Sequence, residues 1–81
     1  MIVDRFKDYI DSKDLEIHIY NNGIYIVNYI LISSFSNNRI EIKGNNKLIS
    51  INGNKLIISK LKKEEIYISG DIYELILKWN I

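Results

Sequence analysis

The chain has 81 residues, a formal net charge of +1, and neither cysteine nor proline. This length is enough for one small domain of marginal stability, and the lack of cysteine excludes disulfides. A charge so close to zero gives no indication of nucleic-acid binding, which usually requires a basic face. The longest apolar stretch, residues 24–32, is far shorter than the roughly 18 residues needed to span a bilayer, and the N-terminal residues lack a signal-peptide pattern. We therefore expect a cytoplasmic protein that binds no nucleic acid and does not span a membrane.

The N-terminal segment has the spacing of a helix. Val3, Phe6 and Ile10 lie three or four residues apart, which places them on one helical face. We predict a short helix over residues 1–12 and a single β domain over residues 13–81. The helix is expected to cover a face or an edge of the sheet. The alternatives are a helix that binds a partner and a frayed terminus.

Residues 15–20 alternate between apolar and polar side chains, as a strand with one buried face does. Asn21, Asn22 and Gly23 follow, and these residue types tolerate the positive φ angles of a hairpin turn. We therefore predict a strand that ends in a hairpin turn containing Gly23.

Residues 24–32 are apolar on both faces of a strand. This pattern is typical of a strand in the centre of a sheet or in an interface. We expect this segment to be one strand, and we expect a homo-oligomer that assembles either through this strand or through an open sheet edge, which no proline guards. The candidate interface residues are Ile24, Tyr25, Ile26, Val27, Tyr29 and Leu31.

Residues 33–38 are mostly polar and predict a loop, with Phe35 packed back onto the domain. Residues 39–43 alternate again, which predicts a strand whose two isoleucines face the core. Residues 44–46 combine glycine with two asparagines and predict a turn.

Residues 47–72 contain three short apolar runs separated by turn residues, which is the pattern of a strand meander. We predict hairpin turns around Gly53 and Gly70 and a charged bend at residues 60–65.

The register at the first of these turns has two alternatives. A turn at residues 52–53 uses the commonest hairpin signal and places Ile49 opposite Leu56. A turn at residues 53–54 places Ile51 opposite Leu56 and gives better cross-strand pairs. The sequence does not choose between them.

The predicted strands recur at intervals of about eight to ten residues, which suits a sandwich or a barrel-like roll. The fold class that we predict is all-β, an antiparallel meander folded into a small β-sandwich or roll, with a short N-terminal helix. A β-solenoid with parallel pairing is the alternative, but tight turns favour antiparallel hairpins.

Groups that could carry out chemistry are few and scattered. His18 is the single histidine, so there is no cluster of histidines for zinc. Glu64 and Glu65 are adjacent, and adjacent side chains of a strand point to opposite faces rather than into one cleft. The serines of residues 33–36 lie outside any nucleophile motif, and no phosphate-binding glycine pattern is present. We predict no catalytic residue, no metal and no cofactor, and hence a protein that is not an enzyme.

One ordered string of residues runs through most of the chain: Asn28-Tyr29, Phe35-Ser36, Ile40-x-Ile42-Lys43 and Ile49-x-Ile51-x-Gly53-x-x-Leu56-x-Ile58-x-x-Leu61-x-x-Glu64-Glu65-Ile66-x-Ile68-x-Gly70-x-Ile72. The string resembles the YabP/YqfC family of small sporulation proteins from endospore-forming Firmicutes. The resemblance covers about residues 15–76, and it departs from the family near Leu31, where a glycine is usual.

The resemblance implies a non-enzymatic sporulation protein that acts in spore coat or envelope assembly through protein–protein interaction. Its implied location is the mother cell or the surface of the developing spore, and its implied partners are other sporulation or coat proteins. Two other functions stay open. The first is a small ligand- or glycan-binding module that uses Tyr20, Tyr25, Tyr29 and the asparagine-rich loops. The second is a filament-forming β-solenoid scaffold.

Overall fold

The computed structural model describes residues 14–79, so the helix predicted over residues 1–12 lies outside the described part of the chain. The described residues form one six-stranded sheet with the strand order β1-β2-β6-β5-β4-β3. The strands are β1 (Glu16–Tyr20), β2 (Gly23–Val27), β3 (Leu31–Phe35), β4 (Arg39–Gly44), β5 (Lys47–Leu61) and β6 (Glu65–Trp79). Every neighbouring pair is antiparallel, which confirms the predicted all-β antiparallel fold. The β-solenoid alternative is wrong, because it requires parallel pairing.

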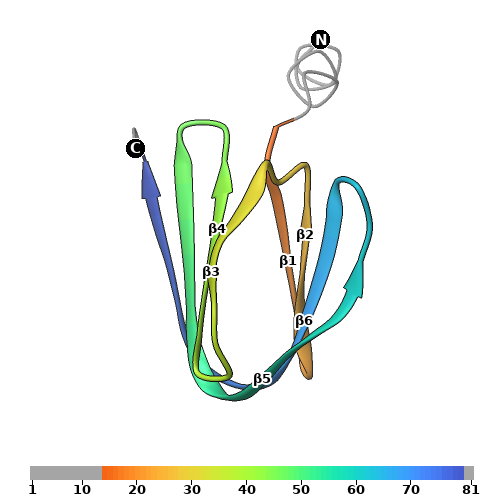
Figure 1. The fold of residues 1–81 in the computed structure, drawn as a ribbon, viewed down its shortest axis with the longest axis vertical. Helices are drawn as coiled ribbons and strands as arrows, with labels where there is room; N and C mark the ends of the chain where they lie inside the picture. Colours follow the sequence, from red (N-terminus) through yellow and green to blue (C-terminus); the bar gives the residue numbers. More distant parts are fainter. Residues whose placement is uncertain (1–13, 80–81) are drawn as a thin grey trace, which may run out of the picture.

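The two long strands β5 and β6 form a hairpin that bends halfway along its length (Figure 1). The sheet therefore folds over on itself into two layers. The first, here called the β3 layer, contains β3, β4, residues 47–52 of β5 and residues 72–79 of β6. The second, the β1 layer, contains β1, β2, residues 65–69 of β6 and residues 57–61 of β5.

The hairpin turns predicted around Gly53 and Gly70 are wrong, because both glycines lie inside continuous strands. Residues 52–57 and 72–74 are irregular in register, so β5 and β6 contain extra residues at the bend. Such β-bulges bend a strand and use the same residue types as turns. Neither predicted register exists, since Ile49 pairs with Leu77 and Ile51 with Leu75.

Close backbone contact at the bend explains its two glycines. A Cβ atom on Gly53 would lie 2.2 Å from the carbonyl oxygen of Asp71 in β6. Gly70 has a φ of +127°, and a Cβ atom there would lie 2.6 Å from the carbonyl oxygen of Lys55 in β5. Lys55 itself has a φ of 55°, which is uncommon for a residue other than glycine. The two strands thus touch where each is distorted.

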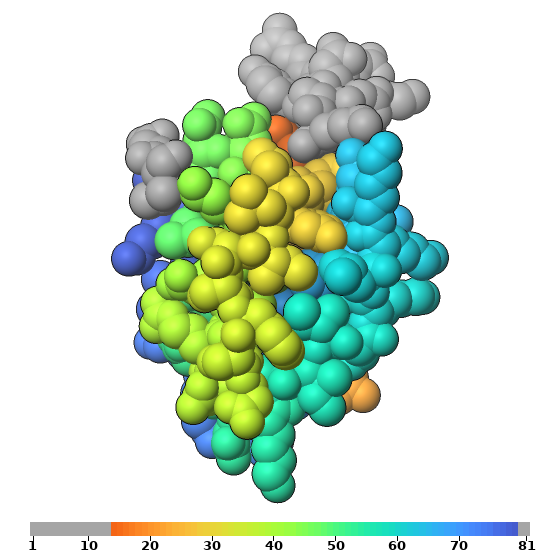
Figure 2. Space-filling view, viewed as in Figure 1, coloured from red at the N-terminus to blue at the C-terminus, as the bar shows by residue number. Residues whose placement is uncertain are grey.

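The loop between β3 and β4 holds the bend from outside. The backbone N–H of Gly53 donates to the carbonyl oxygen of Asn38 at 3.1 Å, and that of Leu56 donates to Asn37 at 2.7 Å. Figure 2 shows this loop beside the second half of β5. These bonds join the β3–β4 loop to the bend and give partners to the backbone N–H groups of Gly53 and Leu56.

The prediction of one strand over residues 24–32 is also wrong. Asn28, with a φ of 66°, follows the end of β2, and the chain then crosses to the other layer, where β3 begins at Leu31. The side-chain amide of Asn28 donates to the carbonyl oxygen of Asp14 at 2.9 Å, and its backbone N–H donates to that of Glu64 at 2.6 Å. Tyr29 donates its hydroxyl to the carbonyl oxygen of Lys62 at 3.1 Å. These bonds fasten the crossing segment to its surroundings.

The loop predicted over residues 33–38 begins too early, because β3 extends to Phe35, whose side chain is exposed. Residues 33–35 form a strand despite their polar composition, because β3 pairs with β4. The serines lie in an edge strand, where their side chains remain exposed to water. The predicted turns at residues 21–23 and 44–46 and the bend near residues 62–64 are confirmed.

The core lies between the two layers and consists of aliphatic side chains from both. Ile40 and Ile42 of β4 are fully buried, as predicted. The whole set is Ile24, Ile26, Ile40, Ile42, Ile49, Ile51, Leu56, Ile66 and Ile68. Because β-branched isoleucine suits a strand and fills the interlayer space, this composition favours a thin, dry core.

Replacing Gly53 with alanine tests the contact at the bend. The new methyl group would lie against the Asp71 carbonyl, so the backbone must shift, and we expect a loss of about 1–3 kcal/mol of unfolding free energy in urea titration. Gly44→Ala is the matched control, because its methyl group would meet only the flexible end of Leu15 at 3.0 Å. Equal losses for the two variants would contradict this account.

Candidate functional site

The potentially reactive side chains do not converge on one cleft. His18 is exposed on the outer face of β1, where its Nε2 lies 3.1 Å from Oε1 of Glu16. Glu65 accepts a hydrogen bond from the hydroxyl of Tyr25, while Ser34 and Ser36 lie on the other layer. Within residues 14–79, no group of three or more His, Cys, Asp or Glu side chains is placed to hold a metal ion.

The six predicted interface residues do not share one surface. Ile24 and Ile26 belong to the core, and Tyr29 packs against it. Tyr25 and Val27 are half-buried on the outer face of the β1 layer. Leu31 is 45% exposed on the β3 layer. The segment is therefore divided between core and surface.

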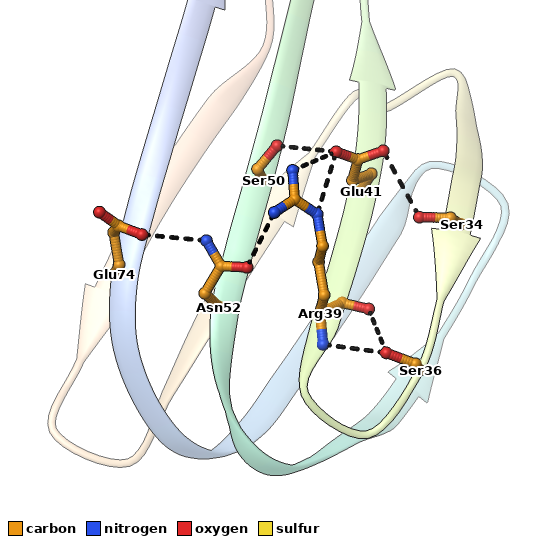
Figure 3. Close-up of polar contacts among 7 residues, drawn as sticks. All are labelled: Ser34, Ser36, Arg39, Glu41, Ser50, Asn52 and Glu74. Carbon is orange, nitrogen blue, oxygen red and sulfur yellow. Dashed lines mark hydrogen bonds and ion pairs between the residues drawn. The ribbon is translucent and has the colours of Figure 1, made fainter.

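The outer face of the β3 layer has a polar network that crosses four strands (Figure 3). Arg39 donates to Oε2 of Glu41 through Nη2 at 2.7 Å and through Nε at 3.2 Å. The hydroxyls of Ser50 and Ser34 donate to the same carboxylate at 3.2 and 3.5 Å. Asn52 of β5 extends the network toward β6. Its Oδ1 accepts a hydrogen bond from Nη1 of Arg39 at 3.3 Å.

Asn52 then donates its amide to Oε1 of Glu74 in β6 at 3.0 Å. The network links equivalent positions of neighbouring strands, so it fixes their alignment. The Arg39 guanidinium lowers the pKa of Glu41 below its ordinary value of 4.5; burial opposes this shift, and the hydrogen bond from Ser50 reinforces it. These groups satisfy one another, and we assign them a structural role.

The outer face of the β1 layer is aromatic. His18, Tyr25 and Tyr67 are opposite one another on β1, β2 and β6, and the rings of His18 and Tyr25 have centroids 5.8 Å apart. Tyr20 lies at the end of β1 and is 55% exposed. The ring of Tyr67 covers Gly23, where a Cβ atom would lie 2.4 Å from the hydroxyl oxygen.

Hydrogen bonds hold two of these rings in place. Tyr67 donates its hydroxyl to Oδ1 of Asn22 at 3.2 Å. Tyr25 donates to the carboxylate of Glu65, and this bond, followed by desolvation, raises the pKa of Tyr25 above its ordinary value of 10.0. The result is a fixed aromatic row, here called the tyrosine row, made of His18, Tyr20, Tyr25 and Tyr67.

Four strand edges are open among the described residues. The β1 layer ends at β1 and at residues 57–61 of β5, and the β3 layer ends at β3 and at residues 72–79 of β6. Exposed apolar side chains gather on these edges: Ile19, Tyr20, Leu31, Phe35, Ile57, Leu61, Tyr73 and Trp79. An open edge offers unpaired backbone N–H and C=O groups to another strand.

Sequence reasoning considered an open sheet edge but did not locate these edges, because it placed turns at the bend and so contained no long strand with one free side. The one available signal was the parity of the apolar residues. Core-facing positions change from odd (Ile49, Ile51) to even (the buried Leu56 and the partly buried Ile58) across the bend, as a bulge requires. In β6 they change from even (Ile66, Ile68) to odd.

A family model described as the YabP family matches residues 11–80, which is most of the chain. The chain belongs to the YabP family. Comparison with curated proteins and with solved structures gave no significant match. Membership of the YabP family indicates a sporulation-related protein. No helix in the described part of this YabP-family protein is long and apolar enough to cross a membrane.

The ion pair in the polar network predicts an acid-sensitive component of stability. Because Glu41 has a lowered pKa in the fold, its contribution is complete above about pH 4.5 and is lost as the pH falls through the folded value. We expect Glu41→Gln to lower stability at neutral pH and to reduce the loss of stability between about pH 6 and pH 3 in thermal unfolding. Asp71→Asn, at an exposed carboxylate, is the control. An unchanged acid limb in Glu41→Gln would contradict the assignment.

Proposed function

We propose that this YabP-family protein is a non-enzymatic component of spore coat or envelope assembly that acts through protein–protein interaction. The observation that supports this function most directly is the combination of family membership with apolar residues on open strand edges. An edge strand binds another strand through backbone hydrogen bonds, while the alternating side chains select the partner.

The distribution of polar groups also supports a role in assembly. Arg39, Glu41 and Ser50 are engaged within the β3 layer, and Glu65 and Tyr25 bond each other within the β1 layer. The described groups with catalytic potential are thus distributed over two outer faces. Partners of this module are a second copy of the chain or other sporulation and coat proteins, and its place of action is the mother cell at the surface of the developing spore.

A fluorescent fusion expressed from the native locus tests this function. We expect the fusion to form a shell around the developing spore, and we expect deletion of the gene to yield spores with a defective coat that lysozyme penetrates. A fusion that stays diffuse throughout sporulation, together with normal spores from the deletion strain, would refute the proposal.

The tyrosine row favours a second function, the binding of a glycan. Tyr20 is exposed at one end of the row, and the flat rings of His18 and Tyr25 continue it over neighbouring strands. Aromatic rings that combine an apolar face with a polar tip suit the alternating apolar and hydroxyl surfaces of a sugar.

Sedimentation with purified peptidoglycan tests this second function. Tyr20→Ala should release most of the bound protein into the supernatant, because it removes the accessible ring of the row. Phe35→Ala is the matched control, since Phe35 is 56% exposed, against 55% for Tyr20, but lies in β3. Sedimentation that both substitutions reduce equally, or that is absent in the unaltered protein, would exclude the tyrosine row as a glycan site.

A further inference from the structure

The free edge of β6 differs from the other open edges in length and regularity. Residues 74–79 pair with residues 47–52 of β5 without any shift in register, and no described strand pairs with their other side. By contrast, β1 and β3 have five residues each, β3 contains a bulge after Ile32, and the free edge of β5 has a register shift between Ile58 and Lys60. Short strands and bulges protect an edge against pairing, and the β6 edge has neither over these residues.

The residues of this edge are complementary to themselves in an antiparallel arrangement. Two copies of a strand related by a two-fold axis pair so that one residue lies opposite its own copy. If that residue is Ile76, Glu74 lies opposite the partner's Lys78, and Lys78 lies opposite the partner's Glu74. On the core-facing side of the sheet, Leu75 and Leu77 then lie opposite the partner's Leu77 and the partner's Leu75.

We propose that the chain forms a two-fold symmetric dimer through antiparallel pairing of the β6 edge, with Ile76 opposite the partner's Ile76. The pairing extends the β3 layer into one continuous sheet across both copies. This inference rests on the proposed function in assembly and names the surface and the partner through which the module self-associates.

The charges select this register over its neighbours. A two-fold axis at Leu75 would place Glu74 opposite the partner's Ile76, and an axis at Glu74 would place two like charges opposite each other. An axis at Leu77 would place Ile76 opposite the partner's Lys78. Among these arrangements, the one centred on Ile76 alone pairs Glu74 with the partner's Lys78 and joins apolar to apolar residues at the remaining positions.

The environment of Glu74 permits this contact. Its Oε1 accepts the amide of Asn52 at 3.0 Å, and a carboxylate has two oxygens, each able to accept more than one hydrogen bond. The polar network across the β3 layer thus holds Glu74 at the edge in a fixed orientation.

The same register accounts for two exposed aromatic residues. Tyr73 is 73% exposed and Trp79 is 63% exposed, at opposite ends of the edge. In the dimer the regular pairing ends at Trp79, which then lies near the partner's Tyr73 at the bulge, and the same contact forms at the other end. Lys47, whose Nζ lies 4.6 Å from the ring centroid of Trp79, already supports one face of that ring. Aromatic pairs across strands add to the stability of a sheet.

Charge reversal combined with multi-angle light scattering tests the pairing in the full chain. We expect the unaltered protein to be a dimer, and we expect Glu74→Lys or Lys78→Glu alone to weaken dimerisation by about tenfold, because each altered pair occurs twice across the axis. The double variant Glu74→Lys/Lys78→Glu restores opposite charges and should recover the dimer. Lys43→Glu, on the outer face of β4 and away from the edge, is the control for a change of net charge.

Single cysteines test the register directly, since the chain has no cysteine of its own. Ile76→Cys should form a disulfide with its own copy under mild oxidation, because residues directly opposite in an antiparallel pair have Cα atoms about 5 Å apart. Glu74→Cys should not crosslink, because its copy lies four residues further along the partner strand, roughly 13 Å away.

The outcomes separate the two proposals. A strict monomer, or a dimer that is indifferent to the charges at residues 74 and 78 and that fails to crosslink at residue 76, overturns the β6 pairing. Either outcome would mean that another occupant, such as a coat protein or residues 1–13 of the chain itself, covers the β6 edge. Localisation of the fusion to the spore would be unaffected, so the function in assembly and this particular dimer fail independently.

Discussion

The close contact of β5 with β6 at the bend is the constraint on which the rest of the structure depends. Gly53 lies against the carbonyl of Asp71, and Gly70 lies against the carbonyl of Lys55, so the two strands turn together rather than separately. Because both strands bend at the same point of the hairpin, β5 and β6 stay paired on either side of the bend and contribute strands to both layers. The core isoleucines of the two layers pack against each other because the bend places the layers face to face.

The same bend creates the open edges. In the β3 layer, β5 lies between β4 and β6, so the free side belongs to β6; in the β1 layer, β6 lies between β2 and β5, so the free side belongs to β5. Each long strand is therefore central in one layer and an edge in the other. The described residues close the core with two layers and contain no further strand that covers these sides. The self-association that we propose at one of these edges therefore rests on the topology rather than on an added motif.

Much of the fold could be predicted from the sequence, because period-two alternation decides both strand type and buried face. Ile40 and Ile42 were assigned to the core on this basis, and the structure agrees. Local turn signals failed where tertiary pairing overrode them: glycine and asparagine permit a bulge as readily as a hairpin. The difference depends on whether β6 lies alongside β5, which is a long-range property. The division of the predicted strand over residues 24–32 has a related reason, since Asn28 ends β2 and the two halves of that apolar run then lie in different layers.

The surface that we propose for assembly consequently consists of residues along a strand edge. A β edge usually avoids unwanted partners through proline, inward charges or bulges, and this chain has no proline. On β6, Glu74 and Lys78 face outward with Ile76 between them, so a strand with another charge pattern meets repulsion or an unpaired charge, whereas a second copy meets its complement. Specificity at such an edge comes from the order of charges along the strand, while affinity comes from backbone hydrogen bonds and apolar pairs. In the dimer that we propose, specificity and affinity thus come from different groups of the same edge.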